Sequence, residues 1–169
     1  MSIQPKRPEI DLKKNNFDRF LEWLGLAGVL LLAGLVVYRF PRLPDTVPTH
    51  FGADGLPDAF GSKYQLWILP AVGIVLFTGL SILARFPHVF NYPGKITPEN
   101  AAEKYRMAAQ LIRVLNVFLV FVFVYITFTA IRTAQGKQEG LGNFFIIFFV
   151  LLISFIMVFY LYQLMKDRS

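Results

Sequence analysis

Four apolar stretches constrain this sequence more than any other feature. They run over residues 20–38, 64–84, 114–131 and 144–165. A helix rises about 1.5 Å per residue, so about 20 apolar residues cross a hydrocarbon layer of about 30 Å. A buried strand ends after about eight residues, so the length of these stretches favours helices. The pattern predicts an all-α membrane protein with four transmembrane helices.

The composition supports this fold class. Hydrophobic residues make up 55% of the 169 residues and charged residues 17%, whereas a soluble domain carries about 25% charge. A soluble domain of this size has too little interior to bury so many apolar side chains. The hydrophobic content excludes disorder, and the absence of cysteine excludes a disulfide scaffold.

The distribution of Lys and Arg predicts the orientation. Twelve lie in a tail of residues 1–19, a loop and helical stem of residues 85–113, and a tail of residues 166–169; five lie in the other connections. The positive-inside rule then places both termini in the cytoplasm of a prokaryotic cell, with a single domain of residues 20–165 in the plasma membrane. The net charge of +6 is therefore a topology signal, and the lipid bilayer is the expected partner. No clustered basic patch predicts direct contact with nucleic acid.

The connection 39–63 between the first two helices is predicted to be a compact, hairpin-like extracytoplasmic loop. Its prolines exclude a helix, and Asp54-Gly55 is a strong turn signal, because glycine adopts positive φ and aspartate closes an Asx turn. Extended segments flank this turn on both sides. Their apolar residues favour an ordered cap over a flexible linker.

Four side chains of this loop are candidates for binding a ligand or a metal: His50, Asp54, Asp58 and Lys63. An imidazole with two carboxylates is a reasonable metal set if the three converge. We favour a structural interpretation, in which the aspartates close turns and His50 bonds backbone inside the loop. No spacing supports a nucleophilic triad, so no catalytic residue and no cofactor are predicted.

The segment 85–113 is predicted to begin irregularly and to continue as a helical stem. Thr97, Pro98 and Glu99 have the residue types of a helix start, and no breaker follows before Gly136. One helix is therefore expected from Pro98 through the membrane. The favoured interpretation of its charged start is a solvated face; the alternative is a docking site for a cytoplasmic regulator. The candidate contacts for such a partner are Asn91, Lys95, Glu99, Tyr105 and Arg106.

Small residues in the first two helices predict that these two pair closely, whereas the Phe-rich third and fourth helices are expected to face lipid or to pack loosely. No ionisable residue is predicted near the bilayer midplane, since Glu22 and Arg113 fall at helix ends. This absence argues against a pump or channel. Asn116 is the strongest polar group within a span, and its expected role is a hydrogen bond between helices.

Two motifs give the sequence a family resemblance. The first comprises Leu43-Pro44-Asp45, Val47-Pro48-Thr49-His50-Phe51, Gly55-Leu56-Pro57-Asp58 and Gly61-Ser62-Lys63; the second comprises Asn91-Tyr92-Pro93, Lys95-Ile96-Thr97, Glu99-Asn100-Ala101 and Tyr105-Arg106. Together they resemble the bacterial and archaeal membrane family known as domain of unknown function sixteen-forty-eight. Related domains form the N-terminal part of SdpI-type proteins, which confer immunity to a secreted peptide toxin and hold a repressor at the membrane. This chain has four spans where those proteins have more, so the resemblance does not carry immunity over directly.

The resemblance implies a non-enzymatic membrane protein of immunity or signalling type, which meets an extracytoplasmic peptide or envelope signal and contacts a cytoplasmic regulator. The alternative is a structural or accessory subunit of a larger membrane complex. A small transporter is the third interpretation. The oligomeric state stays open.

Overall fold

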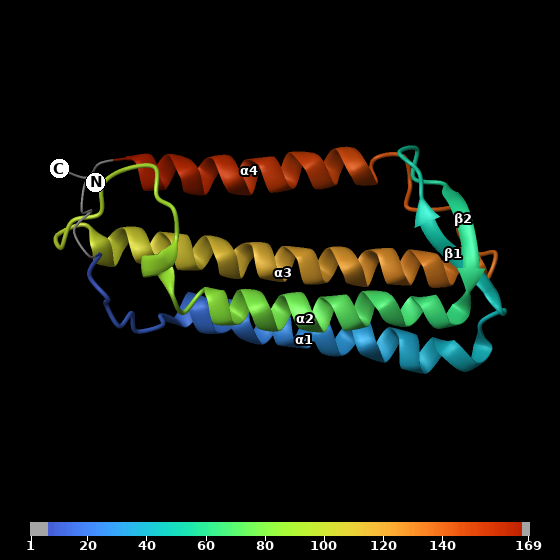
Figure 1. Ribbon diagram of the computed structural model, residues 1–169. Coiled ribbons are helices and arrows are strands. Elements are labelled where there is room, and N and C mark those ends of the chain that lie inside the picture. The colour runs from blue at the N-terminus through green and yellow to red at the C-terminus, as the bar shows by residue number, and fades with distance from the viewer. Residues whose placement is uncertain (1–6, 167–169) are drawn as a thin grey trace, which may run out of the picture.

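The computed structural model describes residues 7–166; residues 1–6 of the predicted basic tail and residues 167–169 of the C-terminal tail lie outside the described residues. Its long helices are α1 (Asn16–Arg39), α2 (Ile68–Leu83), α3 (Ala101–Ala134) and α4 (Phe145–Met165). They run side by side; both ends of the described chain lie at one end of the bundle, and a β hairpin lies at the other (Figure 1). We call these the termini end and the hairpin end.

Four helical segments of the described chain are long and apolar enough to cross a membrane: Asn16–Arg42, Lys63–Leu83, Ala101–Ala134 and Phe145–Met165. The four predicted spans fall within or close to these segments, and the chain is a multi-pass membrane protein. The third helix is longer than its predicted span of 114–131, because α3 extends beyond the apolar stretch at the termini end.

The start of α1 is fixed by a capping box. The Asn15 side chain accepts a hydrogen bond from the Asp18 backbone N–H at 2.8 Å, and the Asp18 carboxylate accepts one from the Asn15 N–H at 3.0 Å. These reciprocal bonds satisfy two backbone donors that a helix start otherwise leaves open. They also hold the Asp18 side chain against the bundle, where it is buried.

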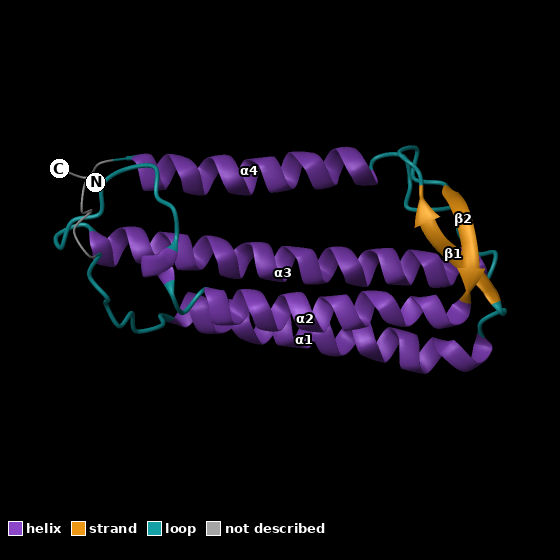
Figure 2. Ribbon diagram, in the orientation of Figure 1, coloured by secondary structure: helices purple, strands orange, loops and turns teal. Residues whose placement is uncertain are grey.

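Between α1 and α2 the chain forms an antiparallel hairpin of β1 (Thr46–Phe51) and β2 (Pro57–Ser62) (Figure 2). Its turn is closed by a bond from the Leu56 N–H to the Asp54 carboxylate at 3.0 Å. Gly55 has a φ of +78°, which favours glycine, as the Asp54-Gly55 pair predicted. The register is irregular between Pro48 and Phe51, where β1 bulges.

The hairpin is seated on the helices by a small apolar core. Its buried members are Val36, Leu43, Val47, Leu66, Ala130 and Ile131. The hairpin turn also contacts the connection between α3 and α4, where the Leu141 N–H donates to the Gly55 carbonyl at 2.8 Å. Tyr125 of α3 donates its hydroxyl to the Leu141 carbonyl at 2.8 Å. Strands, helices and the second connection are thus joined at this end.

The packing of the helices corrects one prediction. Helix α3 contacts α1, α2 and α4, and it contributes more buried residues than the other helices, so its expected role as a lipid-facing or loosely packed helix is wrong. The small residues of α1 serve α3 as well as α2: a Cβ added at Gly28 would lie 2.7 Å from Val120 of α3, and one at Gly25 would lie 2.5 Å from Phe77 of α2. Helix α4 does fit the prediction, because none of its most apolar window is buried.

The start of α3 differs slightly from the predicted start at Pro98. Residues 98–100 form a turn, and the helix begins at Ala101, whose N–H donates to the Thr97 carbonyl at 2.9 Å. The Asn100 side chain accepts from the Thr97 N–H at 2.9 Å, so a local side-chain bond occupies the backbone donor that precedes the helix. From Ala101 the helix continues unbroken to Ala134, as predicted.

Candidate functional site

The hairpin brings together two of its four predicted site residues. His50 Nδ1 lies 2.5 Å from Asp58 Oδ1, and both side chains are more than half exposed. This corrects the favoured interpretation of His50, which placed the ring inside the loop against backbone groups. The ring instead lies on the surface beside a carboxylate, where it can meet a solute.

The other two residues have different partners. Asp54 bonds the Leu56 N–H, as the turn interpretation predicted. Lys63 Nζ lies 3.0 Å from Asp45 Oδ1, at the end of the hairpin away from its turn. Among residues 7–166 no group of three His, Cys, Asp or Glu side chains is placed to hold a metal ion. Within the described residues, His50 therefore has one carboxylate partner, Asp58.

A second polar site lies at the termini end and was not predicted as one. Arg113 of α3 bonds two carboxylates of α1: its Nη1 lies 3.2 Å from Asp18 Oδ1, and its Nε lies 3.3 Å from Glu22 Oε1. Lys14 Nζ lies 2.7 Å from Glu22 Oε2. We call these four residues the ionic cluster. It joins α1 to α3 where their apolar spans begin.

The ionic cluster is deeply buried at its centre. The side chain of Arg113 is 10% exposed and that of Asp18 is 4% exposed, whereas Lys14 and Glu22 are each about one-third exposed. A buried charge is costly unless it is paired and hydrogen-bonded. Here two cations meet two anions, and the second Asp18 oxygen caps α1. Each buried charge in the cluster therefore has a partner of opposite sign.

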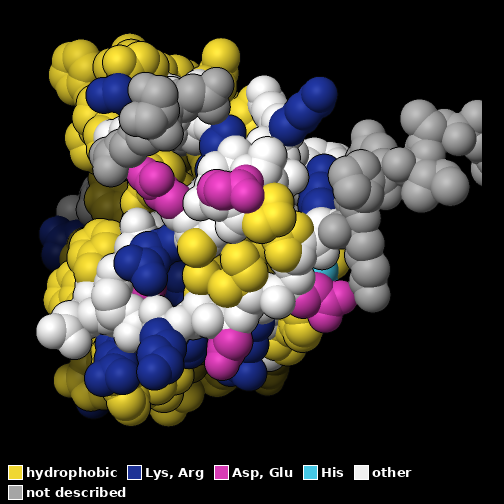
Figure 3. Space-filling view, turned by 90° about the vertical axis from the view of Figure 1, so that its left-hand side faces the viewer, with side chains coloured by type: hydrophobic (Ala, Val, Ile, Leu, Met, Phe, Trp, Pro, Cys, Tyr) yellow, Lys and Arg dark blue, Asp and Glu magenta, His cyan; other side chains and the backbone are white. Residues whose placement is uncertain are grey.

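A cavity of about 670 Å³ opens beside the ionic cluster. We call it the termini-end cavity. Its lining combines the N-terminal segment, the residues that follow α2 and one side of α3. The charged and titratable lining residues are Glu9, Asp11, Lys14, Asp18, Arg85, His88, Arg106 and Arg113. Cationic and anionic side chains also lie close together on the surface of this end of the molecule (Figure 3).

The predicted partner-contact residues are distributed over the same end. Asn91, Lys95 and Glu99 are exposed, and Arg106 lines the termini-end cavity. Tyr105 is fully buried, so in this conformation its predicted contact with a partner is wrong. A hydrogen bond from the Thr97 side chain lowers the pKa of the Glu99 carboxyl below its usual value.

Tyr105 instead anchors the segment that connects α2 to α3. Its ring centroid lies 5.6 Å from that of Tyr92. Arg7, in the N-terminal segment, places its guanidinium carbon 5.7 Å from the Tyr92 ring centroid. Arg7 also donates to the Phe90 carbonyl, and the Tyr92 hydroxyl donates to the Pro87 carbonyl at 2.8 Å. Burial raises the pKa of the Tyr92 phenol. These contacts fix the irregular segment against the start of α3.

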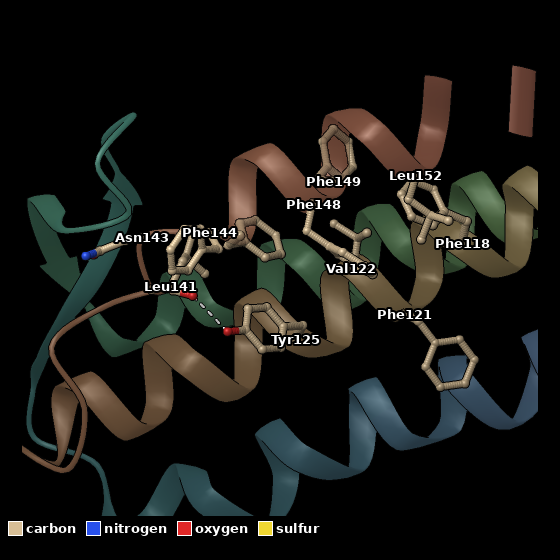
Figure 4. Close-up of a pocket in the computed structure, with 12 residues that line it drawn as sticks. Phe118, Phe121, Val122, Tyr125, Leu141, Asn143, Phe144, Phe148, Phe149 and Leu152 are labelled. Atoms are coloured by element: carbon tan, nitrogen blue, oxygen red, sulfur yellow. Dashed lines mark hydrogen bonds between the residues drawn. The ribbon is translucent and has the colours of Figure 1, made fainter. Parts of the chain in front are cut away.

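An apolar cavity of about 640 Å³ lies between α3 and α4 near the hairpin end (Figure 4). Phenylalanines from both helices line it, and the Tyr125–Leu141 hydrogen bond closes it toward the hairpin. Figure 4 shows Phe144 and Phe148 on the α4 side and Phe121 on the α3 side. Apart from Gly142 and Asn143, its lining is apolar and aromatic.

Comparison with known proteins places the sequence in a family. Residues 27–74 match the family model described as Domain of unknown function (DUF1648). An uncharacterized protein of Archaeoglobus fulgidus is 32% identical over 153 residues, which cover 82% of this chain and 83% of the relative. The chain belongs to the DUF1648 family. Comparison with solved structures gave no match.

The DUF1648 match covers the hairpin but not the ionic cluster. It spans the second half of α1, the hairpin with His50 and Asp58, and the start of α2. Asp18, Glu22 and Arg113 lie outside residues 27–74. The two polar sites therefore differ in their relation to the family model.

Sequence reasoning missed Asp18 because an acidic residue in the first turn of a helix has a sufficient local explanation. One signal did point to it. Asp18 and Glu22 are spaced i, i+4, so they share one face at the start of α1. Two carboxylates on one helix face at the edge of a span require cations, and Arg113 at the edge of another span is a candidate.

Proposed function

We propose that the chain lies in a prokaryotic plasma membrane with both termini in the cytoplasm and the hairpin outside. The Lys and Arg asymmetry of the sequence supports this orientation. All of the predicted cytoplasmic segments that fall within the described residues meet at the termini end. One orientation of the chain is therefore consistent with the charges of every connection.

The orientation can be tested by labelling single cysteines, since the chain has none of its own. Ala53 in the hairpin turn and Ala102 at the start of α3 are both exposed. In intact cells, Ala53→Cys should react with a membrane-impermeant maleimide, and Ala102→Cys should react only after permeabilisation. The opposite pattern would reverse the orientation.

We further propose that the chain is a non-enzymatic sensor of immunity or signalling type. In this proposal the hairpin binds an extracytoplasmic peptide or envelope signal through the exposed His50–Asp58 pair. The exposed residues Asn91, Lys95 and Glu99 then contact a cytoplasmic regulator. The proposal concerns binding and conformational coupling, and no bond is made or broken.

The observation that carries this proposal is the reach of α3. Its 34 residues span about 51 Å at 1.5 Å per residue. Near one end, Ala130 and Ile131 belong to the core that seats the hairpin. Near the other, Tyr105 packs on Tyr92 in the segment that holds the candidate regulator contacts. One continuous helix thus contacts both surfaces that a sensor needs.

Transcript profiling tests the role and does not require an identified signal. Cells would carry the wild type, a hairpin variant (His50→Gln with Asp58→Asn), a termini-end variant (Asn91→Ala with Lys95→Ala) or no copy, and Ala53→Ser serves as the hairpin control. A sensor predicts that both double variants, at normal protein level, change the same transcripts as deletion. Wild-type transcript profiles for both variants and the control, with a changed profile on deletion, would refute the two proposed surfaces.

One observation favours the alternative of an accessory subunit. Helix α4 exposes phenylalanines along its length, and no residue of its most apolar window is buried. A subunit role predicts that the chain migrates in a larger complex after mild solubilisation and that deletion lowers the level of the other subunits. A sensor predicts neither result.

A further inference from the structure

Two arginines line the termini-end cavity without a partner in the described structure. Within residues 7–166, Arg85 and Arg106 make no ion pair and donate no side-chain hydrogen bond, and both are exposed. Arg85 lies two residues after the end of α2, whereas Arg106 lies in the second turn of α3. Their guanidinium groups therefore approach one cavity from two elements and are free to bind an anion.

A third arginine gives the cavity a fixed cationic wall. The ionic cluster uses Nε and Nη1 of Arg113, which leaves the Nη2 group of this cavity-lining residue outside those two bonds. The side chain is nine-tenths buried and held by Asp18 and Glu22. A pre-positioned guanidinium loses little conformational entropy on binding, and its planar donors match phosphate oxygens.

The opposite charge is also present in the lining. Glu9 and Asp11, in the N-terminal segment, are exposed and line the same cavity. A ligand that carried only negative charge would find no partner in these two carboxylates. A ligand with a phosphate and an ammonium group would meet arginines with the first and carboxylates with the second. The mixed lining therefore favours a zwitterion.

The depth of the cavity identifies the source of such a zwitterion. Ala84, Arg85 and Phe86 line it, and they follow directly on the apolar span that ends at Leu83. The residues after a span lie in the headgroup layer of the bilayer. The volume of about 670 Å³ also falls in the range of about 300–1,000 Å³ found for small-molecule sites. A lipid headgroup reaches this position without leaving the membrane.

We propose that the termini-end cavity binds the headgroup of a zwitterionic phospholipid, with Arg85, Arg106 and Arg113 on the phosphate and Glu9 and Asp11 on a primary ammonium group. The site is independent of the orientation of the chain, because it needs only its position at the membrane surface. It is also independent of the proposed sensor role. Phosphatidylethanolamine has the required chemistry.

The test uses the full chain purified in mild detergent. Thermal unfolding and native mass spectrometry would be followed as dioleoyl-phosphatidylethanolamine, dioleoyl-phosphatidylglycerol or inorganic phosphate is added. The test variant is Arg85→Gln with Arg106→Gln. The matched control is Lys13→Gln with Arg19→Gln, which removes the same two charges from exposed positions at the same end that do not line the cavity.

The proposal expects phosphatidylethanolamine to bind the wild type and the control with equal affinity. It should bind the test variant at least about tenfold more weakly, because the variant loses hydrogen bonds to a charged group. Mass spectrometry keeps the test valid if the variant is less stable, because it counts bound lipid on folded protein. A variant with Glu9→Gln and Asp11→Asn should lose its preference for phosphatidylethanolamine over phosphatidylglycerol.

Three results would overturn the proposal. Undiminished phosphatidylethanolamine binding by the Arg85 and Arg106 variant would show that these arginines do not contact the phosphate. If the wild type bound phosphatidylglycerol as tightly as phosphatidylethanolamine, Glu9 and Asp11 would not contact the ammonium group. Binding of inorganic phosphate that displaces the lipid at millimolar concentration would make the cavity a site for free phosphate.

Discussion

Removal of the Arg113 charge should destabilise the protein because it leaves one carboxylate buried without a cation. In Arg113→Met the apolar stem of the side chain is largely kept. Glu22 retains Lys14 at 2.7 Å and is partly exposed, so it loses little. Asp18 is 4% exposed and forms no other ion pair among the described residues. The penalty therefore arises mainly at Asp18.

The magnitude follows from this geometry. Breaking a buried pair from one side costs about 3–5 kcal/mol. Asp18 keeps the hydrogen bond from the Asn15 N–H, so we expect about 3 kcal/mol, at the low end. The double variant Asp18→Asn with Arg113→Met removes both charges and keeps an acceptor for the cap, and it should lose only about 1 kcal/mol, because a neutral pair needs no counter-ion. Two neighbouring changes that offset each other in this way are coupled.

The assay is reversible unfolding in mixed micelles, by titration of sodium dodecyl sulfate and measurement of far-ultraviolet circular dichroism. Arg19→Met is the control, since it removes an equal charge that is exposed, unpaired within the described chain and outside the termini-end cavity, and it should change the unfolding free energy by less than about 0.5 kcal/mol. The reasoning fails if Arg113→Met loses less than about 1 kcal/mol. It also fails if the loss of unfolding free energy in the double variant equals the sum of the losses in the two single variants.

Three further results are expected from the packing, each read as a change in unfolding midpoint in the same assay. Gly28→Ala should destabilise the protein by about 1–3 kcal/mol, because its Cβ would lie 2.7 Å from a buried valine of α3. Gly34→Ala, whose Cβ would meet no neighbouring element within 4 Å, should be neutral or slightly stabilising. Gly140→Ala should destabilise by a similar amount, since its Cβ would clash with the Gly55 carbonyl. Equal midpoints for Gly140→Ala and Gly34→Ala would contradict this contact. Asn116→Leu should cost about 1–2 kcal/mol, because the amide donates to a carbonyl and a hydroxyl of α2 at 3.0 and 3.1 Å; an unchanged midpoint would show that these bonds contribute nothing.

The helices and the hairpin turn were predictable because their causes are local. A span needs only length and apolar composition, and the Asp54-Gly55 turn needs only a residue that adopts positive φ and a carboxylate that closes it. The role of Asn116 was also predictable, since an amide within a span needs a partner on a neighbouring helix. In each case the residue itself or its immediate neighbours in the sequence determine the structure.

The ionic cluster and the central place of α3 were not predictable in the same way. Asp18 and Arg113 are 95 positions apart, and their contact depends on how two helices pack. Lipid and helix surfaces are both apolar, so the phenylalanines of α3 and α4 do not distinguish a buried helix from an exposed one. The exposure of His50 depends on the local irregularity of β1, which shifts the register beside that residue.

The contacts of α3 explain why motion at one end would reach the other in the proposed sensor. Its intrahelical hydrogen bonds run unbroken, so the helix resists bending and moves mainly as a unit. Gly28 and Asn116 restrain its middle against α1 and α2 by one close apposition and two hydrogen bonds. Such restraints permit a small rotation or slide more readily than a separation, because packed interfaces resist voids. In the proposed sensor, a displacement of the hairpin core would then reach the ionic cluster as a changed distance between Arg113 and Asp18, and the Coulomb energy of this buried pair varies with that distance.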